Sequence, residues 1–356
     1  MRSALYWRSK RAFLLLLASL ALAATTRTAV AQSEKPLDIQ FIDVEGGQAT
    51  WIVSPSGESL LVDTGYPGFD GRDANRIAAA VKQAGLSKID YLVITHYHAD
   101  HVGGVPALAA RVPIGTFVDH GPTVEQGERP AALFAEYLET RAKGRHVLVR
   151  PGDTLPVKGL DVRFVSAAGN LITKPLPGAG QANPLCRDYK AADPDPTENA
   201  QSVGMVIAYG SFRLLDLGDL TWNKEHELVC PNNLLGTVDV YLTTHHGLNL
   251  SGPAVLVHAV RPRVAVMNNG AKKGGMPSAW RIIEDSPGLE DLWQLHYSVE
   301  GAADHNVPAP FIANLDETTS HGIRIAAQRD GRFVVTNGRN GQSKTYPPRR
   351  ALAARP

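Results

Sequence analysis

Three histidines and one aspartate lie within six residues of the chain, at His96, His98, Asp100 and His101. Imidazole nitrogen and carboxylate oxygen are the donors that zinc and similar borderline metals prefer. In a loop, His96 and His98 can turn to one ion while Asp100 and His101 turn to a second. Unrelated surface histidines seldom share such a spacing, so the sequence predicts a site for two metal ions.

Two later segments supply the donors that this cluster lacks. Asp219 follows a glycine at the end of a predicted strand, and its carboxylate could bridge two ions. His245 and His246 follow another predicted strand, and either of them could complete the second ion while the other faces the substrate. The predicted metal ligands are therefore His96, His98, Asp100, His101, Asp219, His245 and His246.

A two-metal site ionises a bound water near neutral pH, polarises the bond to be cut and neutralises the developing charge. We predict that Asp100 also orients the resulting hydroxide. His246 is the second predicted catalytic residue, as a proton or hydrogen-bond donor, with the division of roles between His245 and His246 left open. The predicted substrate contacts, for which a solvated surface turn is the alternative, are Lys272, Lys273 and Asn249.

The elements that must position these residues occur in two similar sets. In each half, short strands are followed by a helix, a buried strand and one of the loops described above. The buried strands are Ile89–Thr95 and Val238–Thr243. Near-continuous apolar strands of this kind are typical of a sheet that is covered on both faces. The pattern predicts one α/β sandwich of two similar halves, not two independent domains.

The order of these motifs, His-x-His-x-Asp-His, then Gly-Asp, then His-His-Gly, resembles the metallo-β-lactamase-fold hydrolase superfamily. The resemblance covers roughly Asp38 to Arg332 and implies an αββα sandwich, with two mixed β-sheets flanked by helices. The resemblance implies that Asp63 is a structural aspartate that supports the site loops from behind. It also implies two zinc ions, although manganese or iron can occupy a similar ligand set. The opening from Phe41 to Gly65 is most similar to the hydrolase domain of ComEC-type competence proteins.

The chain departs from the superfamily pattern in two places. Many members carry another ligand histidine before the bridging aspartate, but His120 and His146 come too early for that position. The first ion would then have two histidines, Asp219 and solvent, which is an ordinary catalytic zinc site. Met276 also stands where ComEC-like sequences often have histidine, and its side chain can neither donate a proton nor bind a phosphate.

Residues 1–31 have the pattern of a secretory signal. Four basic residues precede an apolar stretch from Ala12 to Ala24, and Ala29-Val30-Ala31 offers a cleavage site. The apolar stretch is shorter than the ~20 residues of a transmembrane helix, so we expect cleavage, with an uncleaved anchor as the alternative. The expectation is a periplasmic or secreted protein without a transmembrane anchor. Its hydrolase domain would cover 32–338, and a basic, disordered tail would cover 339–356.

Only two cysteines are present, which excludes both a disulfide-dense scaffold and a multi-cysteine zinc ribbon. Export would place Cys186 and Cys230 in an oxidising compartment, where a bridge between them is allowed. Whether they lie close enough to pair is left open by the sequence.

The composition is that of a globular protein, with 44% hydrophobic and 20% charged residues. Without the five basic residues of segment 1–31, the chain has 31 basic and 35 acidic residues. The resulting net charge of −4 argues against tight binding of duplex DNA.

The leading hypothesis is an exported di-zinc hydrolase that uses a metal-bound hydroxide on a phosphoester or phosphodiester. A lactone or β-lactam hydrolase on the same metal pair is the alternative, and a non-catalytic metal-binding or partner-binding protein is the third hypothesis. The oligomeric state is left open.

Overall fold

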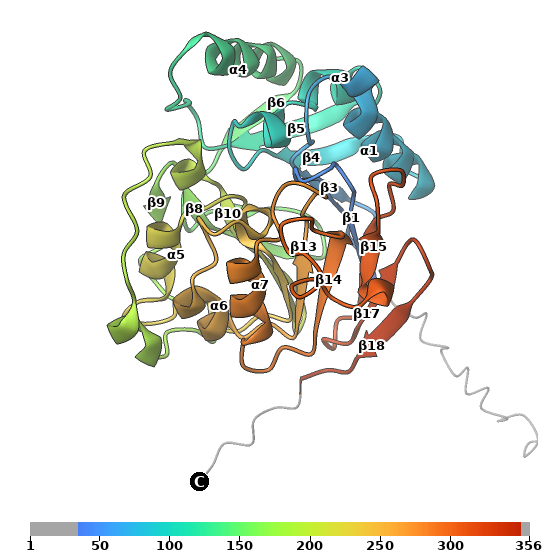
Figure 1. Cartoon of the computed structure of the whole chain (residues 1–356). Coiled ribbons are helices and arrows are strands. Elements are labelled where there is room, and N and C mark those ends of the chain that lie inside the picture. The colour runs from blue at the N-terminus through green and yellow to red at the C-terminus, as the bar shows by residue number, and fades with distance from the viewer. Residues whose placement is uncertain (1–34, 350–356) are drawn as a thin grey trace, which may run out of the picture. The chain divides into compact units, whose positions relative to one another are not determined.

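Two large mixed β-sheets lie face to face, with helices on both outer sides, in the computed structural model (Figure 1). The structure describes residues 35–349. The predicted signal segment, residues 1–31, therefore lies outside the described residues. The arrangement of layers confirms the predicted αββα sandwich.

The first sheet has the strand order β18-β17-β16-β1-β2-β3-β4-β5-β6. The sheet is mixed, because the strands from β1 to β3 pair antiparallel and the strands from β3 to β6 pair parallel. Its strands are β1 (Leu37–Phe41), β2 (Thr50–Val53), β3 (Ser59–Val62), β4 (Ile89–Val93), β5 (Ile114–Asp119), β6 (Arg145–Leu148), β16 (Ile323–Ala327), β17 (Phe333–Asn337) and β18 (Ser343–Tyr346).

The second sheet repeats this plan in the order β15-β14-β13-β12-β11-β10-β8-β7, with β9 paired to β8. Here β8, β10 and β11 are antiparallel, and β11 to β15 are parallel. Its strands are β7 (Thr154–Leu155), β8 (Asp161–Ala167), β9 (Asn170–Leu171), β10 (Gly204–Tyr209), β11 (Phe212–Asp216), β12 (Val240–Leu242), β13 (Val264–Met267), β14 (Asp291–His296) and β15 (Ile312–Asn314).

Helices cover the outer face of each sheet, and three apolar layers result. One core lies between the sheets, a second lies between the first sheet and helices α1, α3 and α4, and a third lies between the second sheet and α5 to α7. The helices are α1 (Arg72–Gln83), α2 (Ala99–Val102), α3 (Val105–Ala109), α4 (Glu128–Arg141), α5 (Trp222–Val229), α6 (Ala254–Val260) and α7 (Pro277–Glu284). Short 3-10 turns are η1 (Phe69–Gly71), η2 (Pro184–Asp188), η3 (Glu198–Gln201), η4 (Thr244–Gly247) and η5 (Ala309–Phe311).

The end of the described chain corrects one expectation, since the sheet continues beyond the boundary predicted at residue 338. β18 pairs with β17, and its Tyr346 is buried and stacks on Phe333. Basic residues of this segment find acidic partners on the second sheet, with Lys344 paired to Asp291 and Arg349 bonded to Asp239. A count of basic residues within the tail could not reveal these partners, because they are distant in sequence. Residues 350–356 lie outside the described residues.

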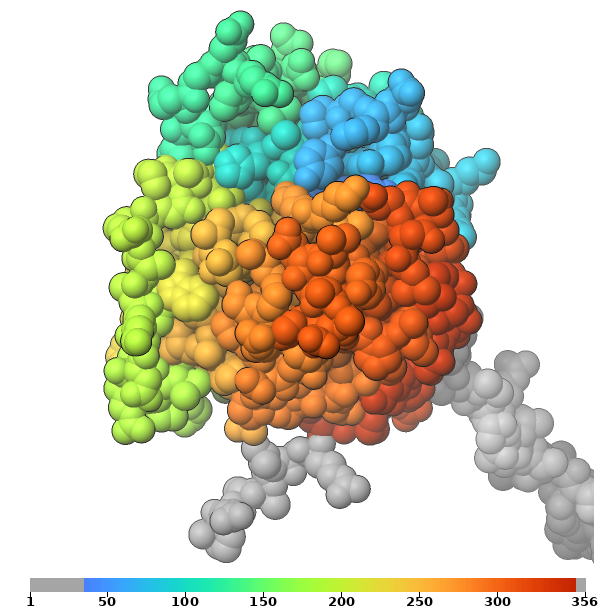
Figure 2. All heavy atoms as spheres, viewed as in Figure 1, coloured from blue at the N-terminus to red at the C-terminus, as the bar shows by residue number. Residues whose placement is uncertain are grey.

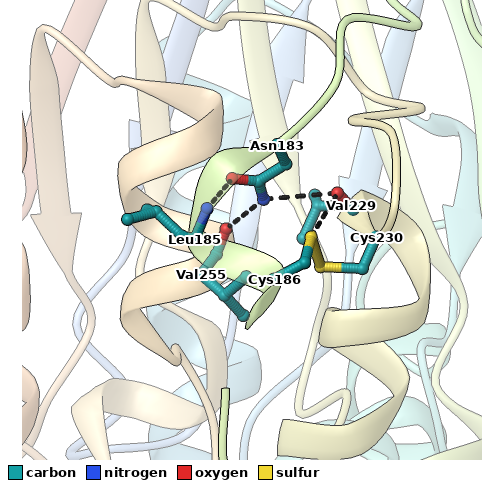
Figure 3. The surroundings of a disulfide bond; sticks show 6 residues. All are labelled: Asn183, Leu185, Cys186, Val229, Cys230 and Val255. Carbon is teal, nitrogen blue, oxygen red and sulfur yellow. Dashed lines mark hydrogen bonds between the residues drawn. A yellow bond between two sulfur atoms is a disulfide. The ribbon is translucent and has the colours of Figure 1, made fainter. Parts of the chain in front are cut away.

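A disulfide joins Cys186 of η2 to Cys230 at the end of α5, with 5.7 Å between the two Cα atoms (Figure 3). The long connection between β9 and β10, yellow-green in Figures 1 and 2, is fastened by it along the outside of the second half. Asn183 adds to the attachment by donating hydrogen bonds to Val229 O at 3.2 Å and Val255 O at 3.0 Å. A connection that the sequence left as a long irregular loop is therefore anchored on two helices.

A buried acid connects α5 to the loop between β12 and α6. Glu225 is 0% exposed, and its Oε2 accepts a hydrogen bond from Gly252 N at 2.6 Å. Burial raises the pKa of this carboxyl to about 8. The fold therefore holds a neutral carboxylic acid beneath the loop.

Across the described part of the chain, none of the helices has both the length and the apolar character that a bilayer crossing requires.

Removing the disulfide should destabilise the domain. We expect the double variant Cys186→Ser/Cys230→Ser to lose about 4 kcal/mol of unfolding free energy, the chain-entropy value for a sequence separation of 44 residues. Guanidinium denaturation of the oxidised protein and the variant measures the difference. Wild-type protein under reducing conditions serves as the control and should behave like the variant. Equal denaturation midpoints for all three would contradict the structural role of the bond.

Stability should fall as pH rises from about 4.5 to about 8, in part because of Glu225. The pKa of its carboxyl rises from an ordinary value of 4.5 to about 8 in the folded protein, so unfolding releases a proton in this window and higher pH favours unfolding, by up to about 1.4 kcal/mol per pH unit. Glu225→Gln keeps a neutral acceptor and should remove this slope. Denaturation curves at several pH values measure it, with the exposed Glu227→Gln on the same helix as the matched control. An unchanged slope in Glu225→Gln would refute the assignment.

Candidate metal centre

The loops that follow β4, β11 and β12 bring the seven predicted metal ligands together. The loop after β4 and helix α2 carry the first histidine cluster, the loop after β11 carries Asp219, and η4 carries His245 and His246. Backbone hydrogen bonds join the loops, and His245 N donates to Gly218 O at 3.0 Å. Loops at the carboxyl ends of parallel strands commonly form such sites, because neighbouring strands end at the same edge.

Asp219 lies at the centre of the cluster. Its Oδ2 is 3.2 Å from Nε2 of His101, 3.4 Å from Nε2 of both His245 and His246, and 3.9 Å from Nε2 of His96. The residue is 2% exposed, and its Oδ1 has no hydrogen-bond partner among residues 35–349. A buried polar atom without a partner indicates a missing ligand or ion. This geometry suits a carboxylate that two ions share.

The donors around this carboxylate fall into two groups. In the first group, His96 Nε2 lies 3.1 Å from His98 Nδ1. In the second, Asp100 Oδ2 lies 3.2 Å from His101 Nε2 and 3.3 Å from His246 Nε2. The members of the second group and the central aspartate offer ligand atoms that all lie within 4.8 Å of one another. That spacing fits a single ion.

The two adjacent histidines of η4 are placed differently. His246 joins the second group, whereas His245 lies beside Asp219 and its Nδ1 contacts Ser251 Oγ at 3.2 Å. Both histidines have left-handed backbone, with φ of 56° and 57°. Such a conformation costs on the order of 1–3 kcal/mol at a non-glycine residue and is typical of functional sites.

Hydrogen bonds behind the imidazoles decide which nitrogen faces Asp219. Thr95 Oγ1 donates to Asp63 Oδ2 at 2.7 Å, so towards His96 Nδ1, at 3.1 Å, it can only accept. His101 Nδ1 donates to the same Asp63 oxygen at 2.7 Å. In both rings the proton on Nδ1 is used behind the site, and Nε2 faces the central carboxylate. Asp63 thus lies behind two of the predicted ligands.

Ser251 acts on His245 in the same way. Its hydroxyl donates to Leu220 O at 2.7 Å, so it accepts from Nδ1 of His245 and leaves Nε2 facing Asp219. The Nε2 atoms of His96, His101 and His245 therefore all face the Asp219 carboxylate. Imidazole nitrogens gathered around a carboxylate in this way are the donor set that zinc-like ions prefer.

The electrostatics of the cluster also favour a cation. Burial alone would lower the pKa of His101, but the carboxylates of Asp219, Asp100 and Asp63 raise it well above its ordinary value. Burial likewise would raise the pKa of Asp219, yet the charges of the surrounding imidazoles hold it well below its usual range. The Asp219 carboxylate therefore stays ionised, and positive charge within the cluster stabilises it. A divalent cation held by Asp100, His101, His246 and Asp219 would supply this charge in place of a protonated His101.

The two lysines of the loop after β13 have different partners. Lys273 Nζ forms an ion pair with Asp100 and lies 3.3 Å from Tyr66 OH. Lys272 is 70% exposed, and its Nζ pairs with Glu317 at 2.7 Å. The structure brings Lys273 to the cluster and corrects the expectation for Lys272, because Glu317 holds its ammonium group away from the site.

The expectation for Asn249 is also corrected. This residue is exposed in the loop that follows η4, and within residues 35–349 its side chain makes no hydrogen bond to the cluster. The backbone after Gly247 turns towards solvent, so proximity in sequence to the histidine pair does not carry Asn249 into the site.

A buried acid beneath the first histidine loop is a feature that the sequence did not predict. Glu198 is 0% exposed and accepts hydrogen bonds from Tyr97 N at 3.2 Å and His120 Nε2 at 3.0 Å. His120 is thereby turned to Glu198, and His146 is turned to Asp119 at 3.0 Å. Neither histidine takes the place of the additional ligand histidine that many superfamily members carry and this chain lacks. The only sequence signal for Glu198 is that its segment precedes the strand pair leading to the central aspartate.

Comparison with known proteins agrees with this architecture. The family model described as Metallo-beta-lactamase superfamily matches residues 43–190. A hydroxyacylglutathione hydrolase of Stenotrophomonas maltophilia (strain R551-3) is 36% identical over 111 residues, 29% of this chain and 37% of that protein. The competence protein ComA of Neisseria gonorrhoeae is 26% identical over 221 residues, 62% of this chain and 25% of that protein. The chain thus matches well under half of the length of these two relatives.

Among solved structures, the metallo-beta-lactamase fold protein YhfI from Bacillus subtilis is 12% identical with a TM-score of 0.44, covering 72% of this chain and 96% of that one. The matched range 43–190 includes Asp63 and the first histidine cluster. The loops that carry Asp219 and the histidine pair lie beyond this range, in the second sheet of the same sandwich. The sequence match over residues 43–190 and the two-sheet fold therefore identify a metallo-beta-lactamase superfamily domain with a candidate metal site.

Proposed function

We propose that the protein is an exported hydrolase that holds two zinc ions and cleaves a phosphoester or phosphodiester. The observation that carries the proposal is the convergence of imidazole nitrogens on the Asp219 carboxylate, with the ammonium group of Lys273 paired to Asp100 beside it. A buried donor set of this kind has no structural use without cations. The adjacent ammonium favours a substrate that is itself an anion.

The residues divide into two ligand groups and a set that serves the substrate. His96 and His98 would hold the first ion, the group of Asp100, His101 and His246 would hold the second, and Asp219 would be shared. When bound, such ions activate water and neutralise the charge that develops on the oxygen atoms of the substrate.

His246 therefore has a ligand role, and His245 remains for proton transfer. The ring of His245 is fixed by Ser251, and its Nε2 faces the site, where it can accept a proton and pass it to a leaving oxygen. Asp100 can orient the attacking water, since its Oδ2 faces both His101 and His246.

Lys273 and Tyr66 form one side of the proposed substrate site. The Lys273 ammonium is 3.3 Å from Tyr66 OH, and its side chain is 30% exposed, so solvent reaches it. An ammonium next to a bimetal centre attracts non-bridging oxygens of a phosphate, because charge-assisted hydrogen bonds are about twice as strong as neutral ones. Neutral lactones would gain less from this arrangement.

A second candidate function is hydrolysis of a thioester, a lactone or a β-lactam on the same metal pair. The sequence match to a hydroxyacylglutathione hydrolase favours the thioester within this group. The same donors and the same activated water would serve, and only the substrate contacts would differ.

Export is part of the proposal and rests on the signal pattern of residues 1–31. The Cys186–Cys230 disulfide supports a periplasmic or extracellular location, since such bonds persist in oxidising compartments. Zinc is proposed as the native metal because its ligand preferences match the imidazole-rich donor set.

A substrate panel tests the proposed chemistry. Purified protein loaded with zinc should hydrolyse bis-p-nitrophenyl phosphate faster than an acyl lactone, a chromogenic cephalosporin, a hydroxyacyl thioester or single-stranded DNA. Asp219→Asn should lose bound metal and lower kcat/KM by roughly a hundredfold or more, because metal activation supplies several kcal/mol. Metal analysis and circular dichroism of both proteins show whether the loss is local. Strong turnover of the thioester or lactone without phosphodiesterase activity would replace the substrate assignment.

The neighbouring lysines provide a matched test of the anion site. Lys273→Met should lower kcat/KM for the phosphodiester by roughly 10- to 100-fold, since a hydrogen bond to a charged group contributes about 1.5–3 kcal/mol. Lys272→Met removes the same charge one residue away and should change kcat/KM less than twofold, because Lys272 faces Glu317. Steady-state kinetics at equal metal content measure both. Equal losses in the two variants would exclude a specific role for Lys273.

A further inference from the structure

The first ligand group differs from the second in its exposure to solvent. The side chain of His98 is 33% exposed, whereas those of His96, His101 and His246 are 0% exposed. A cleft of 580 Å³ adjoins His98 and is walled by the loop before α4 and by α4 itself. A ligand on the wall of an open cleft is not fixed by packing, so its orientation needs another cause.

Glu125 supplies a contact on the outer side of His98. Its Oε1 lies 3.1 Å from Nε2 of His98, while Nδ1 of the same ring lies 3.1 Å from His96 Nε2. A carboxylate can only accept, so the proton of the neutral ring lies on Nε2 and the lone pair lies on Nδ1. The ring therefore directs its lone pair to the first ion position.

Glu125 is itself held by a network centred on Glu198. Glu198 N donates to Glu125 Oε1 at 3.1 Å, and the Glu198 carboxylate accepts from Val124 N at 2.7 Å and Thr123 Oγ1 at 2.9 Å. The same carboxylate accepts from Tyr97 N, between the two ligand histidines. The loop before α4 is thus fixed to the histidine loop from below.

We propose that Glu125, held in place by Glu198, is a positioning residue that fixes the proton and the ring orientation of His98 for the first metal ion. The inference rests on the proposed metal centre. It completes a pattern in which Thr95 orients His96, Asp63 orients His101 and Ser251 orients His245. Carboxylates that accept from the far nitrogen of a ligand histidine raise its basicity and typically change metal affinity by roughly 10- to 100-fold.

Metal binding of Glu125 variants tests the proposal without any substrate. Zinc titration in competition with a chromophoric chelator should show two binding steps in the wild type. Glu125→Ala should weaken one step by roughly 10- to 100-fold and leave the other unchanged. Glu125→Gln keeps an acceptor oxygen and should recover part of the loss. Cobalt titration gives a spectroscopic signature, and we expect the d–d bands of one site only to shift in Glu125→Ala.

Glu136→Ala is the matched control, because Glu136 lines the same cleft, whereas the acidic partner of His98 within residues 35–349 is Glu125. It should keep both zinc affinities within twofold, and the metal-free proteins should share one melting temperature. Wild-type affinity in Glu125→Ala, or an equal loss in Glu136→Ala, would overturn the proposal. If Glu125→Ala does not fold, an affinity of Glu125→Gln equal to wild type with unshifted cobalt bands would overturn it. Absence of zinc binding by the wild type would instead refute the proposed function, so the two failures are distinguishable.

Discussion

A buried carboxylate surrounded by imidazole lone pairs is the interaction on which the rest of the structure depends. Asp219 Oδ2 faces four imidazole Nε2 atoms between 3.2 and 3.9 Å away, and each of these residues is almost completely buried. Bringing these polar groups together costs free energy, because burial removes the water that would otherwise hydrate them. A fold that keeps this arrangement must hold each ring from behind. The residues behind the rings, Thr95, Asp63 and Ser251, are therefore as important to the site as the ligands.

The two halves of the sandwich must also approach closely enough for their loops to meet. A side chain at Gly218 would place its Cβ 2.8 Å from Thr95 Cβ, at the contact between the β11 loop and the β4 loop. At Gly47 a Cβ would lie 2.4 Å from Asp100 O, where the β1–β2 loop supports the second ligand group. Both distances are shorter than atoms tolerate, so these positions admit only glycine. The glycines at these two positions therefore allow the loops to approach closely enough to form the metal centre.

The spacing of the metal-binding residues and the periodicity of apolar residues predicted several strands and the histidine cluster, because both patterns depend on residues that are close in sequence. The two buried strands and the histidine cluster after the first of them were recognisable from adjacent residues, and the structure places them as predicted. The interaction partners of a side chain that are distant in sequence could not be recognised from the sequence. Lys272 and Lys273 are adjacent and identical in type, yet Glu317 determines the direction of one and Asp100 that of the other. The same reason hid the ordered segment 343–349, whose Lys344 and Arg349 have partners at Asp291 of β14 and at Asp239 just before β12.

The difference between the two ligand groups has a consequence for how the site would work. The second group is more deeply buried, since the side chains of His101 and His246 are 0% exposed and Asp63 holds His101 from behind. The first group includes His98, which borders the open cleft and depends on Glu125 for its orientation. The donors of the second group are thus fixed by buried neighbours, whereas the ring of His98 is fixed by Glu125 at the wall of the cleft. Lys273 pairs with Asp100 of the second group, so the two partly exposed side chains at the site, those of Lys273 and His98, belong to different ligand groups.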